Sequence, residues 1–298
     1  MAKEQYIKRK FKPETMELLN KVIPIIDEYR RNGYDLSLRQ VYYQCVARGI
    51  FENVQSNYKK LSRDLSNARL AGLVDWNSLT DRTRSVCGGG GGLTPAEAIK
   101  MAVRIHSCNV WETQPCYLEV WVEKDALVDV VGRGCRKTRA AYGACRGYNS
   151  QSFIYEAAER IKRRGADKER IILYLGDLDP SGTDMTRDVQ KRLDRFNAGV
   201  KVERIALSME QVQQYNPPPC PAKETDTRVE RYKQQYGDLS WELDALRPEV
   251  IEELIDTNVK RYLDLSEFES ILEREQEERA ELRRVADNYE AIVRSLSA

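Results

Sequence analysis

Residues 170–182 constrain the fold of this chain more than any other segment. Their sequence, RIILYLGDLDPSG, is an apolar run that ends in two aspartates, a proline and a glycine. An apolar run of this length predicts a strand that is buried on both faces, as in a parallel sheet covered by helices. The proline and glycine predict a sharp turn into a following helix. The chain is therefore expected to contain an α/β domain built around this strand.

The segments on either side of this strand fit the same pattern. Residues 117–122 predict another strand, and a helical segment at 150–164 follows a shorter strand-like stretch. Strands that alternate with helices are typical of a parallel sheet. We expect this α/β domain to cover residues 116–215, with its further elements in the order strand 140–145, helix 150–164, helix 183–196 and strand 202–207.

Acidic residues follow two of the predicted strands. Glu123 comes after the strand at 117–122, and Asp177 and Asp179 come after the strand at 170–176. In parallel sheets, ligands bind beyond the carboxyl ends of the strands, so the three carboxylates are expected to lie close together. Carboxylates in such proximity repel unless a cation joins them, and oxygen ligands suit Mg²⁺. The spacing predicts a magnesium site; the alternative is that the two aspartates only cap a turn.

The N-terminal part predicts a helical domain. Apolar residues recur at helical spacing in residues 13–31, 38–48 and 55–71, and a short strand-like segment follows at 73–76. Ser37 is the expected N-cap of the second helix. Three helices followed by a strand is the order of a winged helix-turn-helix domain, which we expect within residues 1–115; a plain helical subdomain is the alternative.

In a winged helix the third helix faces DNA. The helix predicted at 55–71 carries four basic side chains on its outer face, and phosphate contacts by such side chains fix a protein on a duplex. Residues 1–115 hold 18 Lys and Arg against 12 Asp and Glu, which is weak support because such an excess is common. The glycine tract at 88–92 is expected to be a wing tip or a linker. The expected DNA contacts are Lys59, Lys60, Arg63 and Arg69.

Residues 216–298 predict a proline-rich linker followed by a helical tail. The linker is the segment NPPPCP at 216–221, and the last helix is expected over 265–296. Apolar residues on this helix alternate at three and four positions, a heptad pattern that serves either packing on the same chain or a dimer contact. The residues of this pattern are Leu282, Val285, Tyr289, Ile292 and Leu296.

Composition narrows the class of protein. No apolar run approaches the roughly 20 residues of a membrane span, and the N-terminus lacks the apolar core of a signal peptide. Seven cysteines without a CxxC pair favour neither a disulfide framework nor a zinc site. We expect a soluble, cytoplasmic protein with reduced thiols and no membrane partner. His106, the single histidine, is expected to be structural.

Two motifs carry a resemblance to a known family. The run VEKDA at 122–126, followed by GDLDPSG at 176–182, resembles the Toprim signature of the topoisomerase VI A subunit and its meiotic break-making relatives. The segment LRQVYY at 38–43 is similar to the part of that family that carries the catalytic tyrosine. The resemblance covers about residues 14–210. The length of the chain is closer to that of the compact A-subunit-like proteins of phages and mobile elements.

This resemblance implies a type IIB topoisomerase-like enzyme that cleaves double-stranded DNA through a phosphotyrosyl intermediate. By position, Tyr43 inherits the role of nucleophile with Arg39 beside it, and Glu123, Asp177 and Asp179 inherit Mg²⁺. The family mechanism also implies a homodimer in which each tyrosine meets the other protomer's metal. The chain has no Gly-rich ATPase motif, so strand passage would need a separate ATPase B-type subunit.

The spacing of Arg39 and Tyr43 is compatible with the inherited roles. Residues four apart lie on one face of a helix, so the guanidinium can hold a phosphate while the phenol attacks it. A phenol has a pKa of about 10 and needs a cation to react near neutrality. Without the resemblance, core packing is the more common role of a Tyr-Tyr pair, and Tyr42 is expected to be in the core.

Other functions remain open on the sequence alone. A Toprim nuclease would hydrolyse DNA with metal-activated water, and a DNA-binding accessory protein would keep the fold without catalysis. Arg39 with Tyr43 favours the transesterase over the nuclease, and the three acids argue against the accessory protein. Asp184 and Glu242 are further acids that could join the metal site; helix capping is an equal alternative for Asp184.

Overall fold

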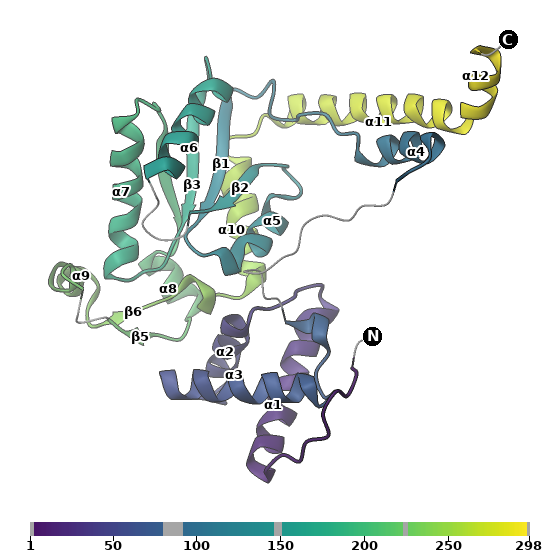
Figure 1. The fold of residues 1–298 in the computed structure, drawn as a ribbon. Helices are drawn as coiled ribbons and strands as arrows, with labels where there is room; N and C mark the ends of the chain where they lie inside the picture. The colour runs from purple at the N-terminus through teal and green to yellow at the C-terminus, as the bar shows by residue number, and fades with distance from the viewer. Residues whose placement is uncertain (1–2, 80–91, 146–150, 223–225, 297–298) are drawn as a thin grey trace.

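The computed structural model describes residues 3–79, 92–145, 151–222 and 226–296. An N-terminal group of helices lies below a central α/β unit, and a helical arm extends from the far side of that unit (Figure 1). The chain thus has the expected mixed α/β architecture, whose sheet carries the candidate site.

The central sheet has four strands, which are all parallel. Their order in the sheet is β2-β1-β3-β4, so β1 and β3 are the two inner strands. All seven residues of β1 are buried, as expected of an inner strand covered on both faces. This confirms the predicted parallel α/β domain. The strands are β1 (Cys116–Val122), β2 (Ala141–Ala144), β3 (Glu169–Leu175) and β4 (Lys201–Ala206).

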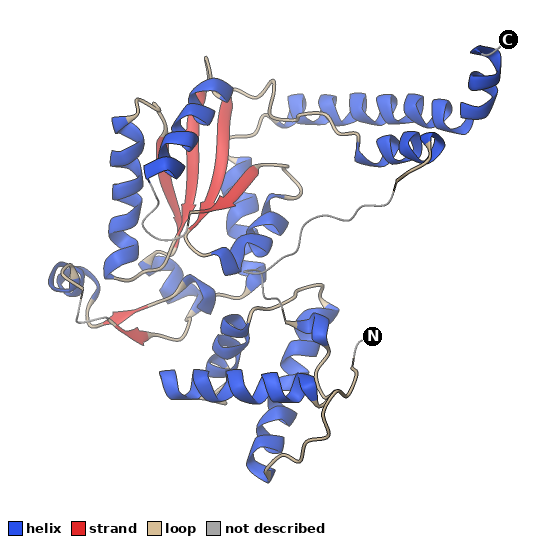
Figure 2. Ribbon diagram, viewed as in Figure 1, coloured by secondary structure: helices blue, strands red, loops and turns tan. Residues whose placement is uncertain are grey.

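Helices cover both faces of this sheet (Figure 2). On one face, α6 (Gln151–Arg164) and α7 (Pro180–Arg195) pack against Trp121 and Tyr174. On the other face, α5 (Val128–Cys135) and α10 (Pro248–Lys260) pack against the alternate strand residues, such as Val120 and Leu173. Because successive side chains of a strand point to opposite faces of the sheet, the core is divided into two layers.

Helix α10 extends the α/β domain beyond the boundary expected at residue 215. Ile251, Ile255 and Val259 of this helix are fully buried in the same cluster as β1 and β3. The sequence predicted only a linker and a helical tail for residues 216–298. The proline-rich segment also differs from a linker, because β5 (Cys220–Pro221) pairs antiparallel with β6 (Leu239–Ser240).

The N-terminal helices form at the expected positions. They are α1 (Pro13–Arg31), α2 (Leu38–Ala47) and α3 (Gln55–Leu70), and they share one apolar core. The Ser37 hydroxyl caps α2 by accepting a hydrogen bond from the Gln40 N–H, while the Ser37 N–H donates to the Gln40 side-chain oxygen. This capping box is a strong local reason for α2 to begin there.

The prediction of a strand at 73–76 is wrong. This segment turns into a short 3₁₀ helix, Trp76–Ser78, because the Asp75 carboxylate accepts the Asn77 N–H and pairs with Arg30 at 2.5 Å. In the described part of residues 1–115 the only β pairing is one isolated bridge between Leu36 and Leu79. A winged helix is therefore not confirmed, and all but the last residue of the glycine tract lies outside the described residues.

Arg133 of α5 joins the N-terminal helices to the α/β domain. Its guanidinium lies over the Tyr34 ring, 3.9 Å from the centroid, and donates a hydrogen bond to the Gly33 carbonyl. The same side chain pairs with Glu252 on α10 at 2.7 Å. A planar guanidinium can stack on an aromatic ring and pair with a carboxylate at the same time, which a lysine ammonium cannot do in this way. These contacts therefore require arginine at position 133.

The remaining helices lie at the edges of the domain and in the arm. Two short helices, α8 (Met209–Tyr215) and α9 (Val229–Tyr236), flank β5. In the arm, α4 (Pro95–Ile105) lies beside α11 (Leu265–Asp287), and α12 (Tyr289–Leu296) bends away from it (Figure 1). The expected helix 265–296 is thus interrupted at Asn288, and Leu296 is 82% exposed.

None of the helices in the described ranges is long and apolar enough to cross a lipid bilayer. This agrees with the absence of a long apolar run in the sequence.

Gly182 fixes the approach of α7 to the end of β3. A Cβ at this position would lie 2.3 Å from the Asp177 carbonyl oxygen, so Gly182→Ala should force the backbone apart. We expect a loss of about 1–3 kcal/mol in the free energy of unfolding, the usual cost of overpacking. Gly143→Ala in β2 is the control, because its Cβ would meet nothing within 4 Å. Equal urea midpoints for the two variants would contradict the claim that only a glycine fits between α7 and the Asp177 carbonyl.

Candidate active site

The acidic residues predicted as metal ligands lie at the carboxyl edge of the sheet. Glu123 follows β1 and Asp177 follows β3, and these strands are paired neighbours. The Glu123 N–H donates to the Leu175 carbonyl at 2.9 Å, and the Asp177 N–H lies 3.3 Å from Glu123 Oε2. The sheet register therefore brings Glu123 and Asp177 together, as the sequence predicted.

Asp179 has a different environment from Asp177. Its carboxylate is the N-cap of α7: Oδ1 accepts hydrogen bonds from the Gly182 N–H at 2.5 Å and the Ser181 hydroxyl at 2.9 Å. Pro180 occupies the first turn, where its missing N–H costs nothing. Asp179 is thus a helix cap in this structure, with one carboxylate oxygen, Oδ2, outside the capping interactions.

Lys124 lies in the middle of the acidic residues. Its ammonium is 2.8 Å from Asp177 Oδ2, 2.9 Å from Glu242 Oε2 and 2.9 Å from Asp244 Oδ2. Asp177 is only 6% exposed and Asp244 is fully buried, so neither carboxylate can rely on water for solvation. The Lys124 ammonium therefore compensates carboxylates from two segments of the chain, the turn after β3 and residues 242–244.

Arg204 of β4 donates hydrogen bonds to the turn between β3 and α7, which carries Asp177 and Asp179. Its guanidinium donates to the carbonyls of Gly176 at 2.9 Å, Asp177 at 2.5 Å and Gly182 at 2.9 Å. Burial lowers the pKa of this guanidinium, although the acidic neighbours oppose the shift. These bonds fix the turn between β3 and α7 and hence the position of Asp177.

Arg39 connects helix α2 to this cluster. Its guanidinium forms an ion pair with Glu242, and its Nε lies 3.5 Å from Asp244 Oδ2. Burial tends to lower the pKa of Arg39, but Glu242 and the other acidic neighbours outweigh it and raise that pKa. The N-terminal helices and the sheet edge thus share one network of charges within a single chain.

Tyr43 lies on the same face of α2 as Arg39, as the spacing predicted. The Arg39 guanidinium carbon is 6.0 Å from the centroid of the Tyr43 ring. Tyr43 is only 3% exposed, and its hydroxyl lies 3.6 Å from Cys220 Sγ. Both residues line a cavity of ≈ 350 Å³ together with Glu242. Tyr42 is also buried and donates to the Val54 carbonyl at 2.9 Å, which confirms its expected place in the core.

Cys220 belongs to the proline-rich segment and covers the Tyr43 hydroxyl. The Asn53 amide holds this segment by donating to the Pro219 carbonyl at 2.8 Å and to Cys220 Sγ at 3.1 Å. Burial raises the pKa of the Tyr43 phenol, and the nearby Glu242 charge raises it further. In this conformation Tyr43 is a protonated phenol shielded from solvent.

The ionisation of the acidic residues follows from their neighbours. Burial raises the pKa of Glu123 to about 7, and the adjacent Asp177 contributes to the shift. Burial also raises the pKa of Asp177, against the opposing effect of Lys124. Burial acts the same way on Glu242, but Lys124 and Arg39 outweigh it and lower that pKa to about 2. Glu123 and Asp177 thus have raised pKa values, whereas the pKa of Glu242 is lowered.

Two of the predicted ligands fit a magnesium ion. Mg²⁺ in proteins is often held by one or two carboxylates and keeps several waters. Glu123 and Asp177 supply two such carboxylates, and an ion that binds Asp177 would share its oxygens with Lys124 and the Leu243 N–H. Asp244 Oδ1 is a buried oxygen without a hydrogen-bond partner, which adds a further acceptor to this edge.

Asp184 lies outside the acidic cluster. It pairs with Arg187 at 2.7 Å and with Arg228 at 3.4 Å, on the exposed side of α7. Glu242, the other additional acid considered from the sequence, belongs to the cluster through Lys124 and Arg39.

The basic residues of α3 fall into two groups. Lys59, Lys60 and Arg63 are exposed, as expected of a surface that meets phosphates. Arg69 instead stacks over Trp76, with 4.5 Å between its guanidinium carbon and the ring centroid, and donates to the Trp76 carbonyl. Arg69 therefore stabilises the end of α3 in this structure.

Comparisons with known proteins give no relative. No family model, no curated protein and no solved structure matches this chain. The geometry of the site is thus the basis for assigning a function.

Lys124 provides a test of the charge network. Lys124→Met removes the ammonium that contacts Asp177, Glu242 and Asp244, so we expect a loss of roughly 3 kcal/mol in unfolding free energy. Lys124 lowers the pKa of both Asp177 and Glu242, so without it these carboxylates bind protons more tightly in the folded protein. The loss should therefore grow as pH rises and shrink as pH falls.

Lys201→Met is the matched control for this variant. Lys201 is 63% exposed and lies 3.4 Å from Glu203, so its loss should cost less than about 1 kcal/mol at any pH. Urea unfolding at several pH values measures both variants. A pH-independent deficit in Lys124→Met would show that the buried carboxylates do not depend on this lysine.

Proposed function

We propose that this protein cleaves DNA with Tyr43 as nucleophile, assisted by Mg²⁺ held at Glu123 and Asp177. The observation that carries the proposal is the network from Arg39 through Glu242 and Lys124 to Asp177. It links the helix bearing Tyr43 to the acidic edge of the sheet. A phenol-bearing helix, two cations and an acidic sheet edge are thus connected by ion pairs, and groups of these kinds can serve phosphoryl transfer.

Each group has a defined task in this reaction. The Tyr43 oxygen forms a bond to phosphorus and the bond from phosphorus to the 3′ oxygen breaks. The phenol proton passes to solvent, and the departing 3′ oxygen takes a proton from solvent. The product is a 5′ phosphotyrosyl end and a 3′ hydroxyl. Bound Mg²⁺ would supply positive charge to the phosphate oxygens. Arg39, oriented by Glu242 and Asp244, would hold the phosphate in line with the phenol.

Tyr43 has to be uncovered before it can attack. At 3% exposure, with Cys220 beside its hydroxyl, it has no access to a duplex in this conformation. The proposal therefore includes displacement of the segment around Cys220 when DNA binds. Its two-residue pairing with β6 and the Asn53 hydrogen bonds are the contacts that would break.

The resemblance to the topoisomerase VI A subunit also implies a homodimer with active sites shared between protomers. In the structure, Arg39 meets Glu242 and Asp244 of its own chain. A dimer, a separate ATPase subunit and resealing of breaks remain parts of the proposal that follow from the resemblance alone.

Hydrolytic cleavage is the second candidate. The burial of Tyr43 favours it, since metal-activated water at Glu123 and Asp177 would not need the phenol. The two reactions leave different products: a protein-linked DNA end in one case and a free end in the other.

Tyr43→Phe separates these two reactions. The ring still fills its site, and only the hydroxyl beside Cys220 is lost, so folding should change little. We expect the variant to lose both breaks and protein-linked ends. Tyr42→Phe is the matched control: its hydroxyl bonds to backbone carbonyls, so stability should fall by about 1 kcal/mol while cleavage persists.

The measurement is duplex cleavage with Mg²⁺, stopped with denaturant and resolved with and without protease. Protease-dependent mobility in the wild type but not in Tyr43→Phe supports transesterification. Breaks with free ends in both proteins would assign hydrolysis, and no breaks in the wild type with Mg²⁺ would remove both candidates.

The exposed basic side chains of α3 are the proposed DNA contacts. Lys59→Ala with Lys60→Ala should reduce the slope of log affinity against log salt by roughly 1.8, because each phosphate contact contributes about 0.9. Lys191→Ala with Arg195→Ala is the control, as both side chains are exposed on α7, away from this surface. A slope that changes only in the control pair would move the DNA surface to α7.

A further inference from the structure

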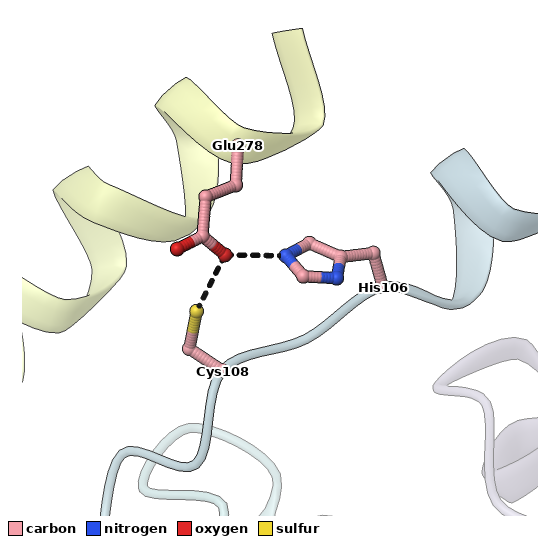
Figure 3. Close-up of side chains that lie close together, drawn as sticks. All are labelled: His106, Cys108 and Glu278. Atoms are coloured by element: carbon pink, nitrogen blue, oxygen red, sulfur yellow. Dashed lines mark hydrogen bonds and ion pairs between the residues drawn. The ribbon is translucent and has the colours of Figure 1, made fainter. Parts of the chain in front are cut away.

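The described residues contain one group of three side chains whose potential metal-ligand atoms all lie within 4.8 Å of one another. The group is His106, Cys108 and Glu278, and it lies in the arm (Figure 3). His106 and Cys108 belong to the connection between α4 and β1, whereas Glu278 projects from α11 toward both (Figure 3). The sequence alone separates Glu278 from the other two by about 170 residues, so it gives no sign of this group.

Hydrogen bonds already align the three side chains. His106 Nε2 lies 2.7 Å from Glu278 Oε2, and the Cys108 thiol donates to the same oxygen at 3.3 Å. All three side chains are partly buried, so the group is accessible to an ion from solvent. A nitrogen, a sulfur and an oxygen therefore converge on one point, where protons now bridge them.

Independent contacts hold the backbone that carries these ligands. Arg279 of α11 donates two hydrogen bonds to the His106 carbonyl, at 2.9 and 2.6 Å. Glu275, one turn earlier on α11, accepts the Cys108 N–H at 2.8 Å and pairs with Arg139. Neighbouring groups thus hold the backbone of His106 and Cys108 in addition to the hydrogen bonds among the ligands, and preorganised metal sites have such supporting contacts.

We propose that His106, Cys108 and Glu278 bind Zn²⁺, with water as the fourth ligand. A thiolate and an imidazole select a borderline-soft ion such as Zn²⁺, whereas the all-oxygen edge of the sheet suits Mg²⁺. On binding, the thiol proton would pass to solvent, and the proton of the neutral imidazole would move by exchange with solvent from Nε2 to Nδ1, which frees Nε2 for the ion. The thiolate and the carboxylate then balance the two charges of the ion.

A bound ion would join α11 to the chain just before β1. The arm touches the α/β domain through this connection, with the Gln114 side chain and the Asp264 backbone forming the next contacts at 2.7 and 3.2 Å. The zinc site would therefore fix the direction of the arm. This role is independent of the proposed DNA cleavage, so its test needs no activity.

The test is titration of the full, chelator-treated chain with Co²⁺, followed by Zn²⁺. Thiolate-bound Co²⁺ gives a near-ultraviolet charge-transfer absorption that carboxylate sites do not give. We expect one equivalent of this absorption, its loss on adding one equivalent of Zn²⁺, and no effect of excess Mg²⁺. Cys108→Ser should abolish it, and Glu278→Gln should weaken Co²⁺ binding by at least about tenfold.

Two matched variants serve as controls. Cys220→Ser removes another partly buried thiol, and Glu277→Gln changes the exposed neighbour of Glu278 on α11. Both should bind like the wild type, and circular dichroism checks that every variant keeps its helices. No thiolate absorption in the wild type, or equal absorption in folded Cys108→Ser, would overturn the proposal.

Discussion

The ion pairs of Lys124 are the interaction on which the rest of the site depends. Its ammonium contacts Asp177, which follows β3, and also Glu242 and Asp244, which lie at the start of and within the short helix Leu243–Ala245. Removing one partner of a buried ion pair leaves an uncompensated charge, which is more costly than never having had the pair. This lysine therefore holds three segments of the chain at one edge of the sheet.

The same network determines how the two parts of the molecule meet. Glu242 and Asp244 bind Lys124 on one side and Arg39 on the other, so the position of α2 is set by the acidic edge of the sheet. The Leu243 N–H donates to Asp177 Oδ1 at 2.8 Å, which adds a directional bond to the charges. Tyr43 reaches the acidic edge because α2 is anchored there.

Much of the α/β domain could be predicted from the sequence because its signals are local. The apolar run of β3 requires a buried strand, and Pro180 with Gly182 requires a turn into α7. Asp179 was expected as a metal ligand together with Asp177, yet the N–H groups at the start of α7 hold one of its oxygens. The strand expected at 73–76 did not form, because Asp75 has a local partner in Asn77 and a distant one in Arg30.

The rest of the site depends on contacts between distant segments. Asp244 and Cys220 lie in stretches that show no strand or helix pattern, and their positions follow from pairing of β5 with β6 and from the charge on Lys124. Glu278 reaches His106 only because α11 lies along α4. Periodicity predicts which face of a helix is buried but not which distant element covers it, so these groupings needed the structure.

The central claim, that Tyr43 becomes linked to DNA, is tested most directly by locating the linkage. Wild-type protein would be incubated with duplex DNA and Mg²⁺, denatured, and digested with trypsin and nuclease for mass spectrometry. Cleavage after Arg39 and Arg48 releases residues 40–48, a peptide that contains Tyr42 and Tyr43. The account predicts a 5′-linked nucleotide on this peptide, assigned to Tyr43 by fragmentation. Cleaved DNA together with an unmodified peptide, or a nucleotide on another residue, would contradict it.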